Sequence, residues 1–323
     1  MLRTFLVKRT LQTSANTVQW NKTLRNHQAN RNYEQALKLF QIGVEKRTFE
    51  PNAVTCITML DICKEMKSLS TLRTIHQWID TTKASNASQK EIYNNPRVRS
   101  LLMDVYIKCQ DLDGAQQVFQ SMNEHNLIDY SALMTGFNQQ RQYERTLQLS
   151  KQIPSKMLFS SPILCTLVLQ ACSELQRYDD GEKIHRSAAH LLSKDKILMN
   201  ELMNFYLKFH KEQQALAIFE QHHVQRTVID YSTFMKYYNR RYQPEKTIDF
   251  YNRLKGNARL PMDHIIYVLV LQAIGNGCCL RTSEQIRESV NKFQSHIDIG
   301  NVLINMYGNC EPYEFVVDVV RAR

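Results

Sequence analysis

The chain reads LMDVYIKC at residues 102–109, LMNFYLKF at 202–209 and LINMYGNC at 303–310. The three phrases are spaced by 100 and then 101 residues. A second phrase, IDYS at 128–131, returns at 229–232 with the same period. Phrases that return in one order with one spacing indicate an internal module of about 101 residues, used three times.

Each module divides further into helical hairpins. The phrases ALKLF at 36–40, AQQVF at 115–119 and ALAIF at 215–219 place a small residue and an aliphatic–aromatic pair on one helix face. Each follows an apolar helix after a short polar turn. A hairpin of about 34 residues cannot bury its apolar face alone, so it must stack on its neighbours. The predicted fold is all-α, a right-handed α–α superhelix resembling tetratricopeptide-repeat solenoids.

The hairpins, called repeats below, vary in length. The second is the longest because it contains TTKASNASQKEIYNN at 81–95, a polar stretch expected to form an exposed loop. About nine repeats are predicted, the last of them incomplete, with these bounds: 17–52, 53–95, 96–126, 127–161, 162–195, 196–227, 228–263, 264–296 and 297 to the end.

Composition supports a helical, basic protein. The 323 residues include only 9 Gly and 7 Pro, which is few for a protein of strands and tight turns. No run approaches the roughly 18 apolar residues of a membrane span, so no membrane partner is expected. The net charge of +10 favours a polyanionic partner, because Lys and Arg gain both Coulomb attraction and counterion release at phosphates. The alternative is a basic protein that is merely soluble.

Residues that resemble catalytic or metal-binding groups have structural interpretations. The 8 Cys include no CxxC pair and no zinc-like Cys/His cluster, so no metal and no cofactor is expected. His76 and His185 share one repeat phase, as do Cys63 and Cys172, and recurrence at a fixed phase is typical of core positions. Tyr106, Tyr206 and Tyr307 also recur, and packing between helices is favoured over stacking on a base. No catalytic residue is expected, and the protein is predicted not to be an enzyme.

The N-terminal segment, residues 1–15, resembles a transit peptide. It contains Arg3, Lys8 and Arg9 with several hydroxyls and no acid, and the first carboxylate in the chain is Glu34. This composition is typical of a mitochondrial targeting segment, although an ordinary basic N-terminus would read the same way. The expected organisation is a targeting segment at 1–15 and a repeat solenoid at 16–323.

The segment from Val98 to Phe137 resembles the junction between short and standard repeats in the PLS subclass of pentatricopeptide-repeat (PPR) proteins. Residues 52–79 and 162–185 are similar to the long repeat of that subclass. The order standard, long, short recurs three times. The resemblance implies sequence-specific binding of single-stranded RNA in an organelle, with one nucleotide per repeat.

In that family a base is read by two residues, one just inside the first helix of a repeat and the other at its end. Both must be able to form a hydrogen bond to a base edge. The resemblance carries this role onto Asn21 with Asn52, Ser100 with Asn126, Ser131 with Ser161, Asn200 with Thr227, Ser232 with Asp263, and Asn301 in the last repeat. The alternative is that these are ordinary polar residues of a helix's first turn.

The long repeats differ. Their inner residues Ile57 and Val268 cannot form a hydrogen bond to a base, while Thr166 with Asp195 is a polar exception. The long repeats are therefore expected to space the others apart. The family code implies adenine opposite the third repeat, guanine opposite the seventh and a pyrimidine opposite the first. It leaves the fourth and sixth repeats open.

The resemblance implies a role in RNA editing, processing or stabilisation. Many PLS proteins end in a deaminase domain with a His-x-Glu and a Cys-x-x-Cys motif, which this sequence lacks. The chain is expected either to supply recognition to a separate editing or processing enzyme, or to be a fragment of a longer editing deaminase. A helical scaffold that binds a protein partner is the alternative from another class.

Overall fold

The computed structural model describes residues 2–46, 49–81, 87–222, 226–257 and 260–277. Helices are the regular elements throughout these ranges, and no strand is found in them. The chain divides into an N-terminal part, residues 1–157, and a C-terminal part, residues 158–323. The third repeated phrase, residues 303–310 with Tyr307 and Cys310, lies outside the described residues, as does Asn301.

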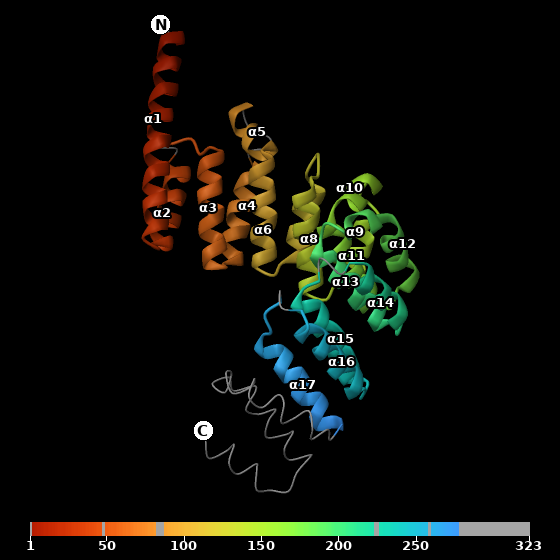
Figure 1. Cartoon of the computed structure of the whole chain (residues 1–323). Helices are drawn as coiled ribbons and strands as arrows, with labels where there is room; N and C mark the ends of the chain where they lie inside the picture. The colour runs from red at the N-terminus through yellow and green to blue at the C-terminus, as the bar shows by residue number, and fades with distance from the viewer. Residues whose placement is uncertain (1, 47–48, 82–86, 223–225, 258–259, 278–323) are drawn as a thin grey trace, which may run out of the picture. The chain divides into compact units, whose positions relative to one another are not determined.

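The N-terminal part holds four helical hairpins (Figure 1). Its helices are α1 (Leu2–Ala29), α2 (Tyr33–Glu45), α3 (Ala53–Met66), α4 (Leu69–Thr81), α5 (Ala87–Asn94), α6 (Pro96–Lys108), α7 (Leu112–Gln120), α8 (Leu127–Gln139) and α9 (Tyr143–Ser150). A short helix, α10 (Ser155–Ser160), spans the boundary between the two parts.

The C-terminal part continues the same alternation. Its helices are α11 (Pro162–Glu174), α12 (Tyr178–Ala188), α13 (Lys196–Lys208), α14 (Glu212–Gln221), α15 (Val228–Arg240), α16 (Pro244–Lys255) and α17 (His264–Gly277), with a 3₁₀ turn at Ala189–Leu191. The first helix of every repeat from the second to the eighth begins at the residue at which the sequence placed a repeat boundary.

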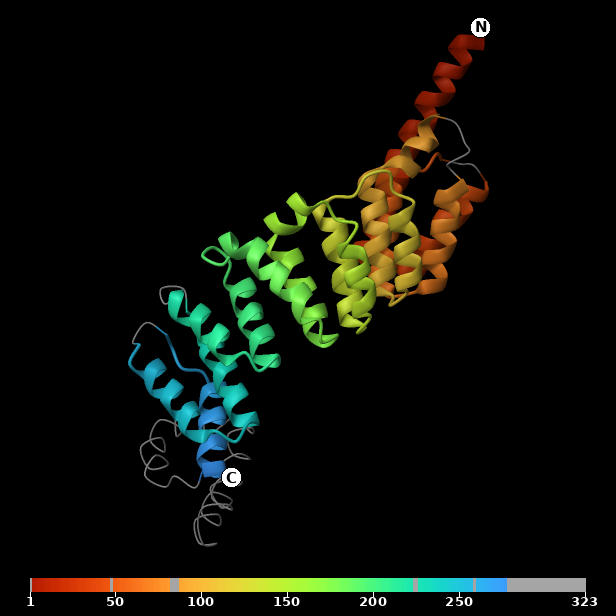
Figure 2. The same ribbon diagram turned by 90° about the vertical axis from the view of Figure 1, so that its right-hand side faces the viewer.

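Successive hairpins stack in register. Within the N-terminal part, the first helices α1, α3, α6 and α8 pack side by side, and each also packs on its own second helix (Figures 1 and 2). Within the C-terminal part, α11, α13, α15 and α17 also pack side by side, and α11, α13 and α15 each pack on their own second helix. Each hairpin thereby buries its apolar stripe against the next one, as a hairpin of this size requires.

The turn inside each hairpin uses one residue in the left-handed region. The seven residues are Arg31, Lys67, Gln110, Arg141, Gln176, His210 and Tyr242, with φ between 51° and 64°. In six of these seven turns the amide of the following residue donates to a carbonyl five residues earlier, as Asp111 N does to Tyr106 O at 3.0 Å. This is the Schellman arrangement, which pairs carbonyls that a helix end leaves unbonded.

The repeated text supplies the same core positions in two repeats. Leu102 and Tyr106 are 0% and 3% exposed, and their counterparts Leu202 and Tyr206 are 1% and 2% exposed. Each buried tyrosine bonds to a histidine on the preceding second helix: Tyr106 Oη lies 2.8 Å from His76 Nδ1, and Tyr206 Oη lies 2.6 Å from His185 Nδ1. These tyrosines pack between helices and are not available to stack on a base.

The stretch expected to be an exposed loop at 81–95 contains helix α5. Ile92 is the reason: its side chain is 3% exposed, and α5 packs against α3, α4 and α6. An eight-residue helix is marginal alone, so this burial stabilises it. The loop prediction was wrong for 87–94.

Candidate nucleic-acid interface

The residues expected to end each repeat also begin the next helix. Asn52, Asn126 and Ser161 are the N-caps of α3, α8 and α11. Thr227 occupies the same position before α15, and Asp263 Oδ1 accepts from Ile266 N at 3.0 Å. Capping alone accounts for a polar residue here, since Asn, Asp, Ser and Thr all satisfy orphan amides.

Capping nevertheless leaves one group of each asparagine unused. In Asn52 and Asn126, Oδ1 accepts amide protons of the following helix, at 3.1 Å from Thr55 N and 2.8 Å from Ile128 N. Both side chains are exposed, and no described residue accepts from either Nδ2. A helix cap with this geometry therefore presents a donor to solvent.

In the first repeat the inner and last residues meet directly. Asn21 Nδ2 donates to Asn52 Oδ1 at 3.2 Å, and Asn21 Oδ1 accepts from Thr55 Oγ1 at 2.7 Å. Thr55 is 0% exposed and its Oγ1 in turn accepts from Asn52 N at 3.1 Å. The third residue of α3 thus joins the two expected reading residues of the preceding repeat.

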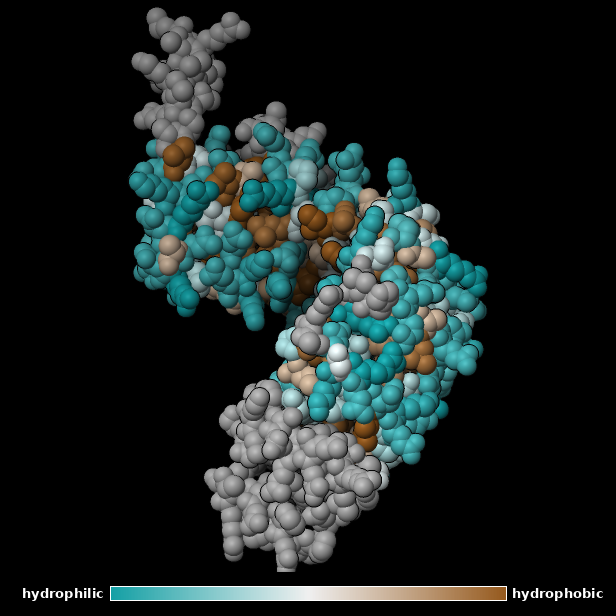
Figure 3. Space-filling view, in the orientation of Figure 1, coloured by the Kyte–Doolittle hydropathy of each residue, from teal (hydrophilic) through white to brown (hydrophobic). Residues whose placement is uncertain are grey.

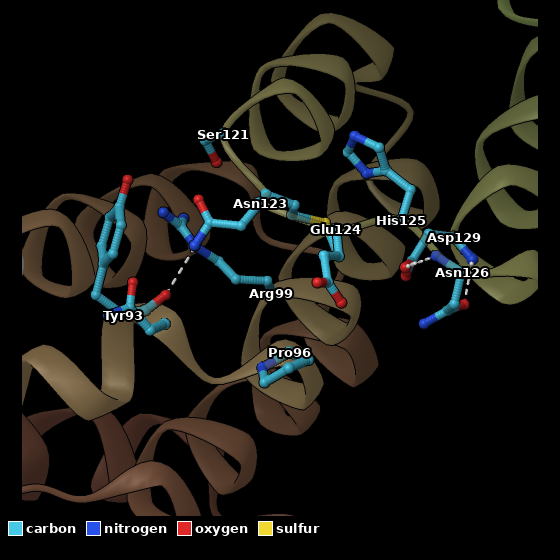
Figure 4. A pocket seen from close by; sticks show the side chains of 11 residues that line it. Tyr93, Pro96, Arg99, Ser121, Asn123, Glu124, His125, Asn126 and Asp129 are labelled. Carbon is cyan, nitrogen blue, oxygen red and sulfur yellow. Dashed lines mark hydrogen bonds between the residues drawn. The ribbon is translucent and has the colours of Figure 1, made fainter. Parts of the chain in front are cut away.

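The third repeat is joined in the same place by a carboxylate. Ser100 Oγ donates to Asp129 Oδ1 at 2.5 Å, and Asn126 N donates to Asp129 Oδ2 at 3.1 Å. Asp129 is the third residue of α8 and is 0% exposed. Figure 4 shows the paired hydrogen bonds between Asn126 and Asp129.

A pocket of about 370 Å³ opens beside this pair, lined by residues that include Asn126 and Asp129 (Figure 4). Its opposite wall carries Arg99, which is 3% exposed. Arg99 Nε donates to the Tyr93 carbonyl at 3.1 Å, and the guanidinium lies 3.9 Å from the centre of the Tyr93 ring. The third repeat therefore has open space next to Asn126, one of its two expected reading residues.

The sixth repeat repeats the arrangement in the C-terminal part. Asn200 Nδ2 donates to Asp230 Oδ1 at 3.1 Å and to Thr233 Oγ1 at 3.1 Å. Thr227 Oγ1 donates to Asp230 Oδ2 at 2.9 Å. Asp230 is the third residue of α15 and is 0% exposed, like Asp129.

The fourth and seventh repeats lack this link. Ser131 Oγ donates to Ile128 O at 3.0 Å, and Ser232 Oγ donates to Ile229 O at 2.9 Å. The third residue of the following helix is Leu164 in one case and Ile266 in the other, neither of which can accept a proton. Ser161 and Ser232 are buried, at 4% and 6% exposure.

The long repeats offer little polar surface at the inner position. Ile57 and Val268 are half-buried and apolar. Thr166 is 9% exposed, and Asp195 serves as the N-cap of α13, with Oδ1 accepting from Leu198 N at 2.8 Å.

Sequence reasoning missed the three buried third-position residues. Their signal is the capping-box spacing in NAVT, NLID and TVID, ending at Thr55, Asp129 and Asp230. It also missed a row of exposed aliphatic side chains at the second position of the repeats. The members are Val18, Val54, Ile128, Ile163, Ile197, Ile229 and Ile265, from 38% to 72% exposed.

Within each part, exposed aliphatic side chains recur at this position in every described repeat except the third. In the N-terminal part, Figure 3 shows apolar patches among hydrophilic surface near the amino ends of the first helices. The third repeat departs from the row because Arg97 occupies the position. Each patch lies three residues before an inner residue, on one helix turn, so both flank the same space.

Basic side chains recur at the other end of the first helices. Lys108 and Lys208 close α6 and α13, and Arg240 closes α15, all three exposed. Lys208 Nζ is paired with Glu174 at 2.6 Å. No described residue pairs with Lys108 or Arg240. Their charges are therefore available to a polyanion.

Groups that could perform chemistry have ordinary structural surroundings. Burial raises the pKa of the Cys63 and Cys172 thiols to about 12, which suppresses the nucleophilic thiolate. Within the described ranges no three His, Cys, Asp or Glu side chains gather as metal ligands would. No described helix has the length and apolar character of a membrane-crossing segment.

Several known proteins are similar to this chain in sequence. A family model described as PPR repeat matches residues 99–127. A chloroplastic pentatricopeptide repeat-containing protein of Arabidopsis thaliana is 23% identical over 296 residues, which is 91% of this chain and 42% of that protein. The chain is similar to pentatricopeptide-repeat proteins. A mitochondrial one from the same plant is 26% identical over 188 residues, or 58% of this chain and 23% of the relative.

The chain spans less than half the length of those relatives. Its fold resembles the crystal structure of the pentatricopeptide repeat protein PPR10 from maize, with a TM-score of 0.51 and 14% identity, over 94% of this chain and 53% of that one. The prediction of an all-α helical-repeat fold is confirmed.

Proposed function

We propose that this chain is a pentatricopeptide-repeat protein that binds single-stranded RNA in a sequence-specific manner. The observation that carries the proposal is the recurrence of linked polar pairs at repeat pitch, in the first, third and sixth repeats. A protein distinguishes unstacked bases mainly through hydrogen-bonding groups placed at a regular spacing. The fourth and seventh pairs, and Asn301, belong to the same proposal.

The exposed aliphatic row supports it. An aliphatic side chain such as Ile128, 71% exposed, loses water-accessible apolar area when a base lies flat against it. Such contact is tolerant of base identity because every base has an apolar face. The aliphatic row would supply affinity for any base, while the linked polar pairs would supply base specificity.

Charge gives a third line of support. The net charge of +10 and the unpaired Lys108 and Arg240 favour phosphates. A groove that binds protein peptides has no need for polar pairs at repeat ends, so the pairs favour RNA over a protein scaffold.

The finer proposal is a PLS-type recognition module that works without catalysis of its own, in editing, processing or stabilisation of organellar transcripts with a separate enzyme as partner. The standard, long and short repeat lengths support the subclass. Arg3, Lys8 and Arg9 support mitochondrial import, and the relatives' names include both chloroplastic and mitochondrial proteins. Helix α1 runs from Leu2 through this segment into the first repeat.

The decisive experiment is selection from a random single-stranded RNA pool with the whole 323-residue chain. We expect an enriched motif and an affinity that falls steeply with salt, with duplex DNA of random sequence as the control. Equal affinity for the RNA pool before and after selection would contradict sequence-specific binding. Tight peptide binding without RNA binding would favour the scaffold.

Asn126→Asp tests a single reading residue. Asp is as good an N-cap as Asn, so α8 stays capped, but the outward donor Nδ2 becomes an acceptor. We expect the preference opposite the third repeat to shift away from adenine by about tenfold, with other positions unchanged. Asn95→Asp is the matched control, because Asn95 caps α6 with Oδ1 3.1 Å from Arg97 N but ends a repeat whose inner residue is Ile57.

A further inference from the structure

We propose that a buried residue at the third position of a repeat selects which hydrogen-bonding group the preceding repeat presents to its base. This position is the third residue of the first helix, in the standard repeats and in the long repeat that follows the first repeat. This inference rests on the proposed RNA-binding function and adds a specificity-determining position outside the reading pair. The residues are Thr55, Asp129 and Asp230, all 0% exposed. Each forms a hydrogen bond to the inner residue of the preceding repeat and does not reach the base itself, so it is a positioning residue.

Two inner asparagines with opposite orientations carry the inference. Asn21 faces Thr55, whose hydroxyl accepts from Asn52 N and has one proton to donate. That hydroxyl lies 2.7 Å from Asn21 Oδ1 and 3.2 Å from Asn52 Oδ1, and the shorter contact assigns the proton to Asn21. The carbonyl of Asn21 is thus occupied by a donor. Its amide nitrogen has two protons, of which Asn52 Oδ1 takes one. The other remains for a ligand.

Asn200 faces an aspartate. A carboxylate only accepts, so Asn200 must turn its amide toward Asp230 Oδ1, at 3.1 Å. Thr233 Oγ1 accepts from the same Nδ2, also at 3.1 Å, so both amide protons are used. Asn200 Oδ1 accepts from Asn204 Nδ2 at 3.1 Å and keeps a second lone pair. Asn200 therefore presents an acceptor.

Ser100 follows the same rule. Its hydroxyl proton is committed to Asp129 Oδ1 at 2.5 Å, so the oxygen offers only lone pairs outward. An acceptor selects bases with an exocyclic amine, adenine and cytosine, whereas a donor selects the carbonyls of guanine and uracil. Where the third-position residue is apolar, as at Leu164 and Ile266, the inner serine bonds to its own helix and no such selection operates.

The test exchanges the two third-position residues in the full chain. In Asp230→Thr the new hydroxyl can accept from Thr227 N, as Thr55 does from Asn52 N, so the cap survives. Its proton would then go to Asn200 Oδ1 and turn the amide outward. We expect the base selected opposite the sixth repeat to change from adenine or cytosine to guanine or uracil by about tenfold. Thr55→Asp should produce the opposite change opposite the first repeat.

A readout without RNA accompanies the selection. In protein labelled with ¹⁵N-asparagine, the Asn200 side-chain NH₂ signal, assigned by its loss in Asn200→Ser, should exchange slowly with water. It should exchange at least several-fold faster in Asp230→Thr. Faster exchange together with a changed base supports the inference.

The failures are distinguishable. Uniformly weaker binding with an unchanged motif would mean that Asp230 is a helix cap only, and would overturn the inference while RNA binding stands. Unchanged amide exchange would overturn the orientation rule itself. If the wild-type chain selects no RNA, the proposed function fails, and the base-selecting role of Asp230 fails with it.

Discussion

Small polar residues in this protein cap a helix with one side-chain atom and leave another atom for solvent or a ligand. Asn52 and Asn126 cap α3 and α8 through Oδ1 and leave Nδ2 without a described partner. A single asparagine therefore contributes about 1 kcal/mol of helix stability and retains a donor. Asp can replace it as a cap but not as a donor, which is why Asn126→Asp separates the two contributions.

The buried histidines give a prediction at the same scale. Burial lowers the pKa of His185, with Glu182 raising it by a smaller amount. The unfolded chain protonates near its usual pKa of about 6.5 while the folded state stays neutral to lower pH, so the unfolded state binds more protons as pH falls. We expect the free energy of unfolding to fall as the pH drops through the range in which the unfolded histidine protonates, with His185 contributing to that fall.

His185→Gln should remove that part of the decline, since glutamine does not titrate and can still bond to Tyr206 Oη. Urea unfolding midpoints at several pH values between 7.5 and 5 measure the effect. His190→Gln is the control for loss of an exposed imidazole. An identical pH profile in His185→Gln and wild type would contradict the assignment.

At the scale of the element, each hairpin is closed by a non-glycine residue in the left-handed region. Seven residues of varied type, among them Gln110 and Tyr242, adopt this conformation. A side chain there costs roughly 1 kcal/mol, because Cβ approaches the following carbonyl oxygen. The Schellman hydrogen bonds and the packing of the two helices offset that cost.

Gln110→Gly should therefore stabilise the protein, by about 0.5–1 kcal/mol after the entropic cost of glycine. Urea unfolding at constant pH measures it. Gln117→Gly is the matched control, because Gln117 is exposed within α7 and should lose about 1 kcal/mol. Destabilisation by both changes would show that the Gln110 turn is unstrained.

At the scale of the whole molecule, the basic charge predicts how RNA affinity responds to salt. Lys108 and Lys208 occupy one repeat phase, yet Lys208 is already paired with Glu174 at 2.6 Å. An unpaired lysine that contacts a phosphate releases a counterion, and each such contact contributes about 0.7 to the salt slope for single strands.

Lys108→Ala should weaken binding to all RNAs alike and reduce the slope of log Kobs against log salt by about 0.7, with the selected motif unchanged. Titrations at four salt concentrations measure the slope. Lys208→Ala should have a smaller effect because Glu174 neutralises that lysine. A motif-specific loss in Lys108→Ala would place the lysine at a base instead of a phosphate.

Several features could be predicted from the sequence because they depend on near neighbours in the chain. Helix boundaries follow from caps and apolar periodicity within a few residues, so the starts of α6, α8 and α13 coincide with the repeat boundaries. The core positions Leu102 and Leu202 follow from repeated text. Helix α5 was missed because its stability comes from burying Ile92 against other helices, which a polar local composition does not reveal.

The sequence by itself determined the repeat phase and the helical-repeat fold, since a period of about 34 residues leaves hairpins no other way to bury their apolar stripes. Only the tertiary structure decided which polar groups meet. Asn21 and Thr55 are 34 residues apart, Ser100 and Asp129 are 29 apart, and Asn200 and Asp230 are 30 apart. Contacts at that separation depend on how one hairpin stacks on the next, because a hydrogen bond tolerates only a few tenths of an ångström of misplacement.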